Sequence, residues 1–206
     1  KNAYEIMTSD ATNIAPKLRK EFVANIFVIY KFGHCNYTGK VRQSGDWKDH
    51  ITLLNGQIIR SLDVKLNEGN IANAVNFKLL IPDTRNGLNE ILASLILKRL
   101  EFISPETFEV KTSVNGVNAK MIFQEKARKE LIERNERREG PIFQGDEDLL
   151  WTFIDKSERL KKLSLSKLVN KNWFMKNEVA QEITINSLKV LQESYIKSRH
   201  IYHKEG

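Results

Sequence analysis

A change in the spacing of apolar residues near Pro82 constrains the fold more than any other feature of this sequence. Before Pro82, apolar residues alternate with polar ones or run together in short segments, as is typical of β-strands. Beyond it, Ile91 and Leu95 fall at helical spacing, and Pro105 interrupts the pattern. The sequence therefore predicts strands first and then one helix over residues 88–100.

Turn signals divide the remaining sequence into strands. Asn115-Gly116 is the strongest of them, because both residues tolerate the positive φ angles of a two-residue hairpin loop. It predicts a hairpin between residues 107–114 and 117–124. Asn55-Gly56 predicts another turn of this kind. We expect further strands at residues 26–30, 38–43, 57–66 and 75–81. We expect further helices at residues 16–24, 126–138 and 177–200. This order predicts the α+β class, with an antiparallel sheet, one inserted helix and C-terminal helices.

The charge is unevenly distributed. The chain has 33 Lys and Arg against 26 Asp and Glu, a net charge of +7. Residues 152–206 hold 11 of the basic and 6 of the acidic residues, so most of the excess lies in the tail. Such a surface attracts phosphates or acidic partners, although lysines on a long helix are more often a solvated face, and we do not expect nucleic acid. No apolar run reaches 18 residues, so we expect a soluble chain without a membrane span, of unknown compartment.

A single cysteine, Cys35, limits the covalent and metal chemistry. One thiol makes no internal disulfide. His34 lies beside it, but no second pair of ligands stands at the spacing of a zinc site. We therefore expect no metal ligands in this chain.

Four sequence blocks occur in the order found in one family. They are VRQSGDWKDH at residues 41–50, RSLDVKL at 60–66, FKLLIP at 77–82 with Arg85 and Glu90, and VNG, FQE, RREGPI and EDLLW between 114 and 151. Together they resemble the CotH-type atypical protein kinases, and the resemblance covers roughly residues 25–151. It implies a kinase-like N-terminal domain over residues 1–151, an ATP and Mg²⁺ requirement, and phosphorylation of a protein substrate. The best-known relatives are bacterial and act on spore-coat proteins.

The resemblance also implies roles for individual residues. A kinase neutralises the nucleotide phosphates with a strand lysine that a helix glutamate holds, and Lys65 with Glu90 is the predicted pair. Arg42 and Lys78 on neighbouring strands are predicted to add phosphate contacts. Glu125 ends the last strand, where a kinase hinge begins, and we expect its role to be positional.

Each of these residues also has a plainer interpretation. Lys78 and Lys65 are equally at home on the solvent face of an alternating strand, and Glu90 would stabilise the positive end of a helix by about 0.3–1 kcal/mol. Arg42 and Asp46 could instead be structural and hold the turn at Gly45, an interpretation that we favour for Asp46.

The sequence departs from a complete kinase in two ways. It has no G-x-G-x-x-G loop, and after Trp151 its only aspartate is Asp155. We therefore identify no catalytic residue and expect residues 152–206 to be a helical, basic segment that precedes a missing C-terminal lobe. A non-catalytic, pseudokinase-like binding module is the alternative. A metal-dependent nuclease, using Asp46 or Asp49 with Asp63-Val64-Lys65, is a further one.

Overall fold

The computed structural model of the chain describes residues 2–9, 13–145 and 166–202. They belong to two compact units, Lys1–Glu136 and Arg137–Gly206. The domain boundary expected at residue 151 lies in the segment 146–165, outside the described residues.

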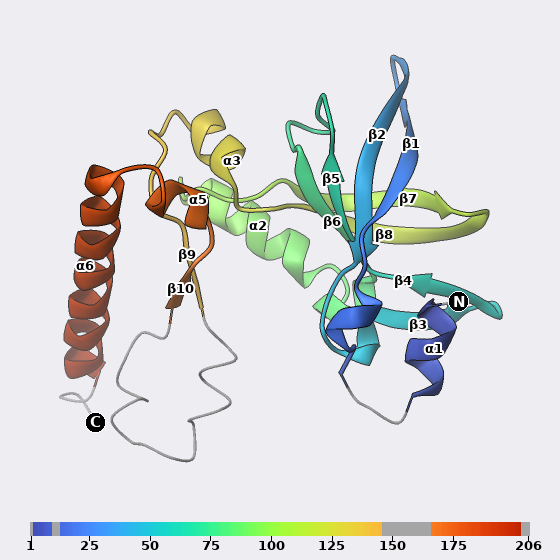
Figure 1. The fold of residues 1–206 in the computed structure, drawn as a ribbon, viewed down its shortest axis with the longest axis horizontal. Coiled ribbons are helices and arrows are strands. Elements are labelled where there is room, and N and C mark those ends of the chain that lie inside the picture. The colour runs from blue at the N-terminus through green and yellow to red at the C-terminus, as the bar shows by residue number, and fades with distance from the viewer. Residues whose placement is uncertain (1, 10–12, 146–165, 203–206) are drawn as a thin grey trace. The chain divides into compact units, whose positions relative to one another are not determined.

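The first unit is built on a six-stranded antiparallel sheet with the strand order β1-β2-β5-β6-β8-β7, which curls on itself in Figure 1. Its strands are β1 (Phe22–Tyr30), β2 (Gly33–Gln43), β5 (Leu62–Leu66), β6 (Asn76–Leu80), β7 (Thr107–Val114) and β8 (Val117–Glu125). A separate hairpin, β3 (Ile51–Leu54) and β4 (Gln57–Arg60), lies between β2 and β5 in the chain. The predicted α+β class with an antiparallel sheet is therefore confirmed.

Two hairpin loops follow the predicted turn chemistry. Asn115 and Gly116 have φ angles of 51° and 84°, and they join β7 to β8 through the closing pair Val114 and Val117. Asn55-Gly56 joins β3 to β4 in the same way, with φ angles of 50° and 76°. Asparagine and glycine adopt this conformation at low cost, which is why the turns could be predicted from sequence alone.

One face of the sheet forms the core. Alternate residues of each strand point to this face, as Leu62, Val64 and Leu66 do on β5. They pack with Phe77 of β6 and Phe123 of β8, whose rings stack with centroids 4.6 Å apart. The other face carries polar side chains such as Asp63 and Lys78, and also the fully buried Leu80 and Ile122.

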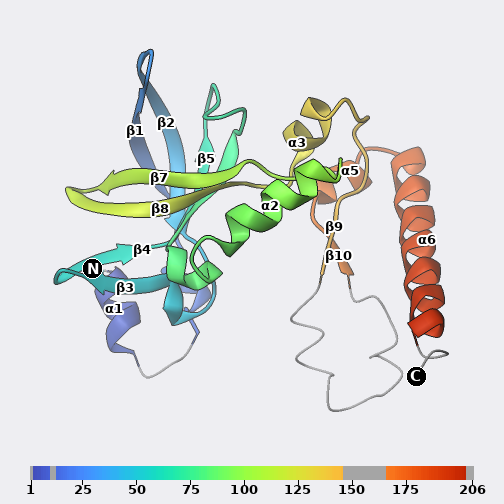
Figure 2. The ribbon, with the colours of Figure 1, turned by 180° about the vertical axis from the view of Figure 1, so that it is seen from behind.

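Helix α2 (Asn89–Arg99) connects β6 to β7, as predicted for residues 88–100. Its one buried residue is Ser94, whose hydroxyl lies 2.8 Å from that of Ser104 and donates to the carbonyl of Pro105 at 2.7 Å. These polar contacts hold the helix against the start of β7 (Figure 2). A 3-10 turn, Pro82–Arg85, precedes the helix.

The N-terminal segment covers a small second core. Ile6 of α1 (Asn2–Thr8) and Ile14 are buried with Ile51 of β3. Only a 3-10 turn, Pro16–Leu18, forms where a helix over residues 16–24 was expected. The prediction was wrong because residues 22–24 are β-branched, aromatic and small, and the chain extends them as the beginning of β1.

Two other predicted elements are shorter than expected. The strand predicted at residues 57–66 is broken at Ser61, whose buried hydroxyl accepts the Ile81 amide at 3.0 Å. This bond turns the chain from the β3–β4 hairpin into the main sheet. The charged helix predicted at 126–138 is limited to α3 (Lys129–Arg134).

The second unit is described by itself. It contains β9 (Phe143–Gly145) paired with β10 (Ser166–Leu168), α5 (Lys171–Phe174) and α6 (Glu178–Tyr202). Asn177 caps α6, because its side-chain oxygen accepts the Ala180 amide at 2.8 Å. The predicted C-terminal helices are thus confirmed. No helix in the described ranges combines the length and apolar character needed to cross a bilayer.

Candidate functional site

A polar row crosses the sheet on the face opposite the core. Arg42 of β2 pairs with Asp63 of β5, Asp63 with Lys78 of β6, and Lys78 with Gln124 of β8. Residues that pair across antiparallel strands point to the same face, so these four side chains lie side by side. The register therefore brings together residues that are up to 82 positions apart in the chain.

Asp63 is fully engaged by two cations. Lys126 donates to both of its carboxylate oxygens at 2.9 Å, and Arg42 donates to Oδ2 at 3.0 Å. The Asp63 side chain is only 11% exposed, so these charge-assisted bonds are shielded from water. The carboxylate consequently neutralises Arg42 and Lys126, and it has few acceptor positions left for a bond from Lys78.

Lys78 is a partly buried cation that has no hydrogen bond or ion pair in the part of the chain that the structure describes. Burial lowers the pKa of its ammonium, and the positive charges of Arg85 and Lys126 lower it further. The carboxylates of Asp63 and Glu90 act in the opposite direction. The protein thus holds this lysine in an environment that disfavours its charged form, as an anion-binding site without its anion would.

Arg85 adds a second cation without an anion. It ends the 3-10 turn after β6, and Asn86 follows with a φ of 50°. Its Nε is buried without a hydrogen-bond partner among the described residues. Because a guanidinium always stays charged, this arrangement is costly unless an acceptor approaches.

His50 lies close enough to Lys78 and Arg85 for their charges to affect its pKa. It is 8% exposed, and its Nδ1 has no partner in the described ranges. Burial lowers the pKa of its imidazole; Asp49 opposes this change, and the charges of Arg85 and Lys78 add to it. Gly45 makes room for the ring, because a Cβ at that position would lie 1.9 Å from it.

Glu90 lies in the first turn of α2 and accepts a bond from Gln124 Nε2 at 2.5 Å. Gln124 in turn is the register partner of Lys78. Glu90 is therefore linked to the polar row through β8, and its charge acts on Lys78. The position near the helix N-terminus also suits a carboxylate, as the plainer interpretation held.

The structure separates Lys65 from Glu90. Lys65 is exposed on β5 and pairs with Lys40 and Asn76, and no ion pair joins it to Glu90. The expected contact does not form because β6 lies between β5 and β8 in the sheet. Lys78, one strand nearer to the helix, is the cation that Glu90 influences.

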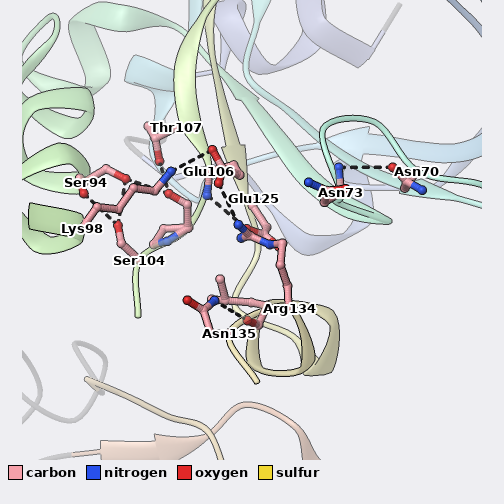
Figure 3. A network of polar contacts seen from close by, with 12 residues as sticks. Asn70, Asn73, Ser94, Lys98, Ser104, Glu106, Thr107, Glu125, Arg134 and Asn135 are labelled. Atoms are coloured by element: carbon pink, nitrogen blue, oxygen red, sulfur yellow. Dashed lines mark hydrogen bonds and ion pairs between the residues drawn. The ribbon is translucent and has the colours of Figure 1, made fainter. Parts of the chain in front are cut away.

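Glu125 belongs to a different cluster on the core side of β8. Its side chain is 2% exposed and accepts bonds from Arg134 and from the Glu106 amide. Glu106 in turn bonds Arg134 at 2.7 Å and Lys98 at 2.8 Å (Figure 3). These four residues form what we call the Glu125 network, which ties α2, α3 and the ends of β7 and β8 together. A positional role for Glu125 in a nucleotide site stays a prediction.

Of the five predicted site residues, Arg42, Lys78 and Glu90 come together, whereas Lys65 and Glu125 do not join them. We call the group Arg42, Asp63, Lys78, Arg85, Glu90 and Lys126 the Lys78 cluster. Sequence reasoning did not select Arg85, Lys126 or His50 as site residues. Arg85 and His50 stand in the family-like blocks, so that signal was available, but nothing in the sequence distinguishes Lys126.

The Lys78 cluster has four cations and two carboxylates, and one of these carboxylates is already saturated. It is therefore suited to bind a multiply charged anion through charge-assisted hydrogen bonds. Two open cavities of about 470 and 360 Å³ lie along the β1–β2 hairpin, and neither is lined by members of the cluster.

Comparison with known proteins adds no further assignment, since no protein-family model and no curated protein matches the chain. The resemblance to the CotH family therefore rests on the four sequence blocks and stays a prediction.

Proposed function

We propose that this chain is a kinase-like, nucleotide-binding domain in which Lys78 and Arg85 contact the phosphates of ATP. The proposal rests on two partly buried cations, close enough for the charge of Arg85 to act on Lys78, with no hydrogen bond or ion pair in the described ranges. A polyphosphate supplies the missing acceptors and removes the penalty of leaving these charges unpaired.

The position of Lys78 favours a kinase-like site over a general phosphate site. In protein kinases a strand lysine is held by a glutamate of the helix that follows, and the lysine neutralises charge on the phosphates. Lys78 lies on the strand directly before α2, and Glu90 lies in the first turn of that helix. Both residues belong to one of the blocks that resemble the CotH family, which supports a part in protein phosphorylation.

Magnesium would have to arrive with the nucleotide. Across the described residues, no group of three or more His, Cys, Asp or Glu side chains could hold a metal ion. Asp63 is bonded to two cations and Glu90 to Gln124, so neither carboxylate fits the role of a free metal ligand. We therefore assign this chain a role in binding phosphate and assign no step of transfer to its residues; transfer would need a C-terminal lobe.

A non-catalytic binding module is the second candidate. It is favoured by Asp63, a carboxylate that is only 11% exposed and that is already bonded to Arg42 and Lys126. The same observation weakens the nuclease hypothesis, because a metal-binding aspartate needs free oxygen atoms.

Calorimetry with ATP, with and without Mg²⁺, tests the proposal. Lys78→Met should weaken ATP binding about tenfold or more, because a charge-assisted bond is lost. Lys65→Met is the matched control: it removes the same charge from the same face and should change the affinity less than twofold. Equal binding by the wild type and Lys78→Met would overturn the assignment. Transfer of the γ-phosphate to casein, measured in parallel, separates an active kinase from a binding module.

A further inference from the structure

Strand β1 is an open sheet edge of unusual composition. Its only strand neighbour is β2, so one side of its backbone has no strand paired to it among the described residues. The nine residues from Phe22 to Tyr30 include no charged residue, glycine or proline. On the polar face of the sheet, Val23 and Ile29 are each 78% exposed and Phe27 is 59% exposed. In Figures 1 and 2 the β1–β2 hairpin projects beyond the ends of β5 and β6.

The other edge of the sheet is protected in the usual way. On β7, Glu109 and Lys111 are exposed and place opposite charges along the strand. Soluble proteins commonly protect open edges with such charges, because an uncharged edge pairs with other strands. Strand β1 lacks such charges, so it is the edge of this sheet that is more open to pairing with another strand.

The sequence of β1 is complementary to itself in one antiparallel register. When two copies pair about Ile26, Val23 of one copy faces Ile29 of the other, and Asn25 faces Phe27. Ala24 faces Val28 on the core side in the same way. Apolar side chains therefore meet apolar ones at most positions, and no like charges oppose each other.

The flanking charges select this register. Glu21 precedes β1 and Lys31 follows it, at equal distances from Ile26. Pairing about Ile26 places Glu21 of each copy opposite Lys31 of the other, so the contact occurs twice. The present contact of Glu21 with Lys40 is 3.8 Å long and solvent-exposed, so it does not prevent the new pair. Any register shift moves both pairs apart.

We propose that a second copy of this chain pairs with β1 in this antiparallel register and joins the two sheets across a twofold axis. The interface is isologous, as in most homodimers, and main-chain hydrogen bonds add to the contacts of Val23, Phe27 and Ile29. The proposal is independent of the nucleotide site, which lies further along the sheet.

Sedimentation velocity over a range of protein concentrations tests the proposal. The wild type should form a dimer, and Val23→Lys/Ile29→Lys should weaken the dimer more than tenfold, because lysines would then face each other across the axis. Both positions are largely exposed, so the variant should fold normally. Leu92→Lys/Leu95→Lys is the control: these α2 side chains are 56% and 53% exposed, and the dimer should persist. A wild type that stays monomeric at all concentrations would overturn the proposal, as would a dimer that only the α2 variant dissociates.

A charge swap tests the register. Glu21→Lys and Lys31→Glu should each raise the dimer dissociation constant roughly threefold to thirtyfold, since each places like charges opposite one another at two sites. The double variant Glu21→Lys/Lys31→Glu restores opposite charges and should recover the wild-type constant. Additive weakening in the double variant would show that these residues do not face each other, and the proposed register would then be wrong.

Discussion

Glu125 and Lys78 point to opposite faces of the same sheet, and the Glu125 network and the Lys78 cluster differ in how their charges are paired. In the Glu125 network, two carboxylates, Glu106 and Glu125, meet two cations, Lys98 and Arg134, and every member has a partner of opposite charge. In the Lys78 cluster the cations outnumber the carboxylates, and Lys78 and Arg85 have no such bond among the described residues.

If the proposed function holds, the difference separates charges that stabilise the fold from charges that bind a ligand. A balanced network loses stability when one member is removed, because the partner stays behind as an unpaired buried charge. An unbalanced cluster carries that penalty already, so removing its surplus cation should not harm the fold. Removing a cation should therefore lower the free energy of unfolding in the Glu125 network, whereas removing Lys78 should not lower it.

The largest effect is expected in the Glu125 network. Arg134→Met leaves the 2%-exposed Glu125 carboxylate without a cation, and we expect the free energy of unfolding to fall by about 3 kcal/mol in urea denaturation. ATP affinity, measured on the folded variant, should not change. A loss below about 1 kcal/mol would mean that the network is not a structural counterpart to the Lys78 cluster.

A smaller effect of opposite sign is expected at Lys78. The pKa of Lys78 is lowered in the folded protein from its ordinary value of 10.5, so the unfolded chain binds the proton more readily and the charge costs stability at neutral pH. Lys78→Met should then raise the free energy of unfolding by roughly 1 kcal/mol at pH 7.

The pH dependence sharpens that prediction. The wild type should gain stability as the pH rises toward 10.5, where the unfolded chain also loses the proton, and the advantage of Lys78→Met should shrink. Urea denaturation at pH 7 and pH 10 measures both quantities. A Lys78→Met protein that is less stable than the wild type at pH 7 would contradict the comparison.

The smallest effect concerns His50. Its folded pKa is lowered below the ordinary 6.5, mainly by burial, and a bound anion favours its protonated form. Sulfate should therefore bind several-fold more tightly as the pH falls from 7 to below 6, because protonation of His50 is then coupled to binding. Calorimetric titration of His50→Gln, which keeps a polar side chain, should show a flat profile. An equal pH dependence in both proteins would remove His50 from the site.

The hairpins and α2 could be predicted because their signals are local. Asn115-Gly116 requires only the φ angles of two residues, and the helix requires only the spacing of residues such as Ile91 and Leu95. The predicted helix at residues 16–24 failed because sheet pairing, a non-local interaction, recruited Phe22 into β1.

The site was harder to predict because it depends on strand order. Lys65 and Lys78 both stand on alternating strands before a helix, and the sequence does not say which strand is the neighbour of β8. The register of β6 decides it, by placing Lys78 beside Gln124 and thus near Glu90. Arg85 Nε is buried without a hydrogen-bond partner among the described residues. Its burial depends on tertiary packing, which no local sequence pattern encodes.

The pKa of Lys78 tests most directly whether this cation, which has no ion pair among the described residues, takes a phosphate as its partner. NMR spectra of the lysine side chains, with the Lys78 signal assigned through Lys78→Arg, measure its pKa directly in the free protein and with ATP. We expect the pKa of Lys78 to lie below its ordinary value in the free protein and to rise clearly when ATP binds. A Lys78 pKa that ATP leaves unchanged, with saturation of the protein shown in the same sample, would contradict it.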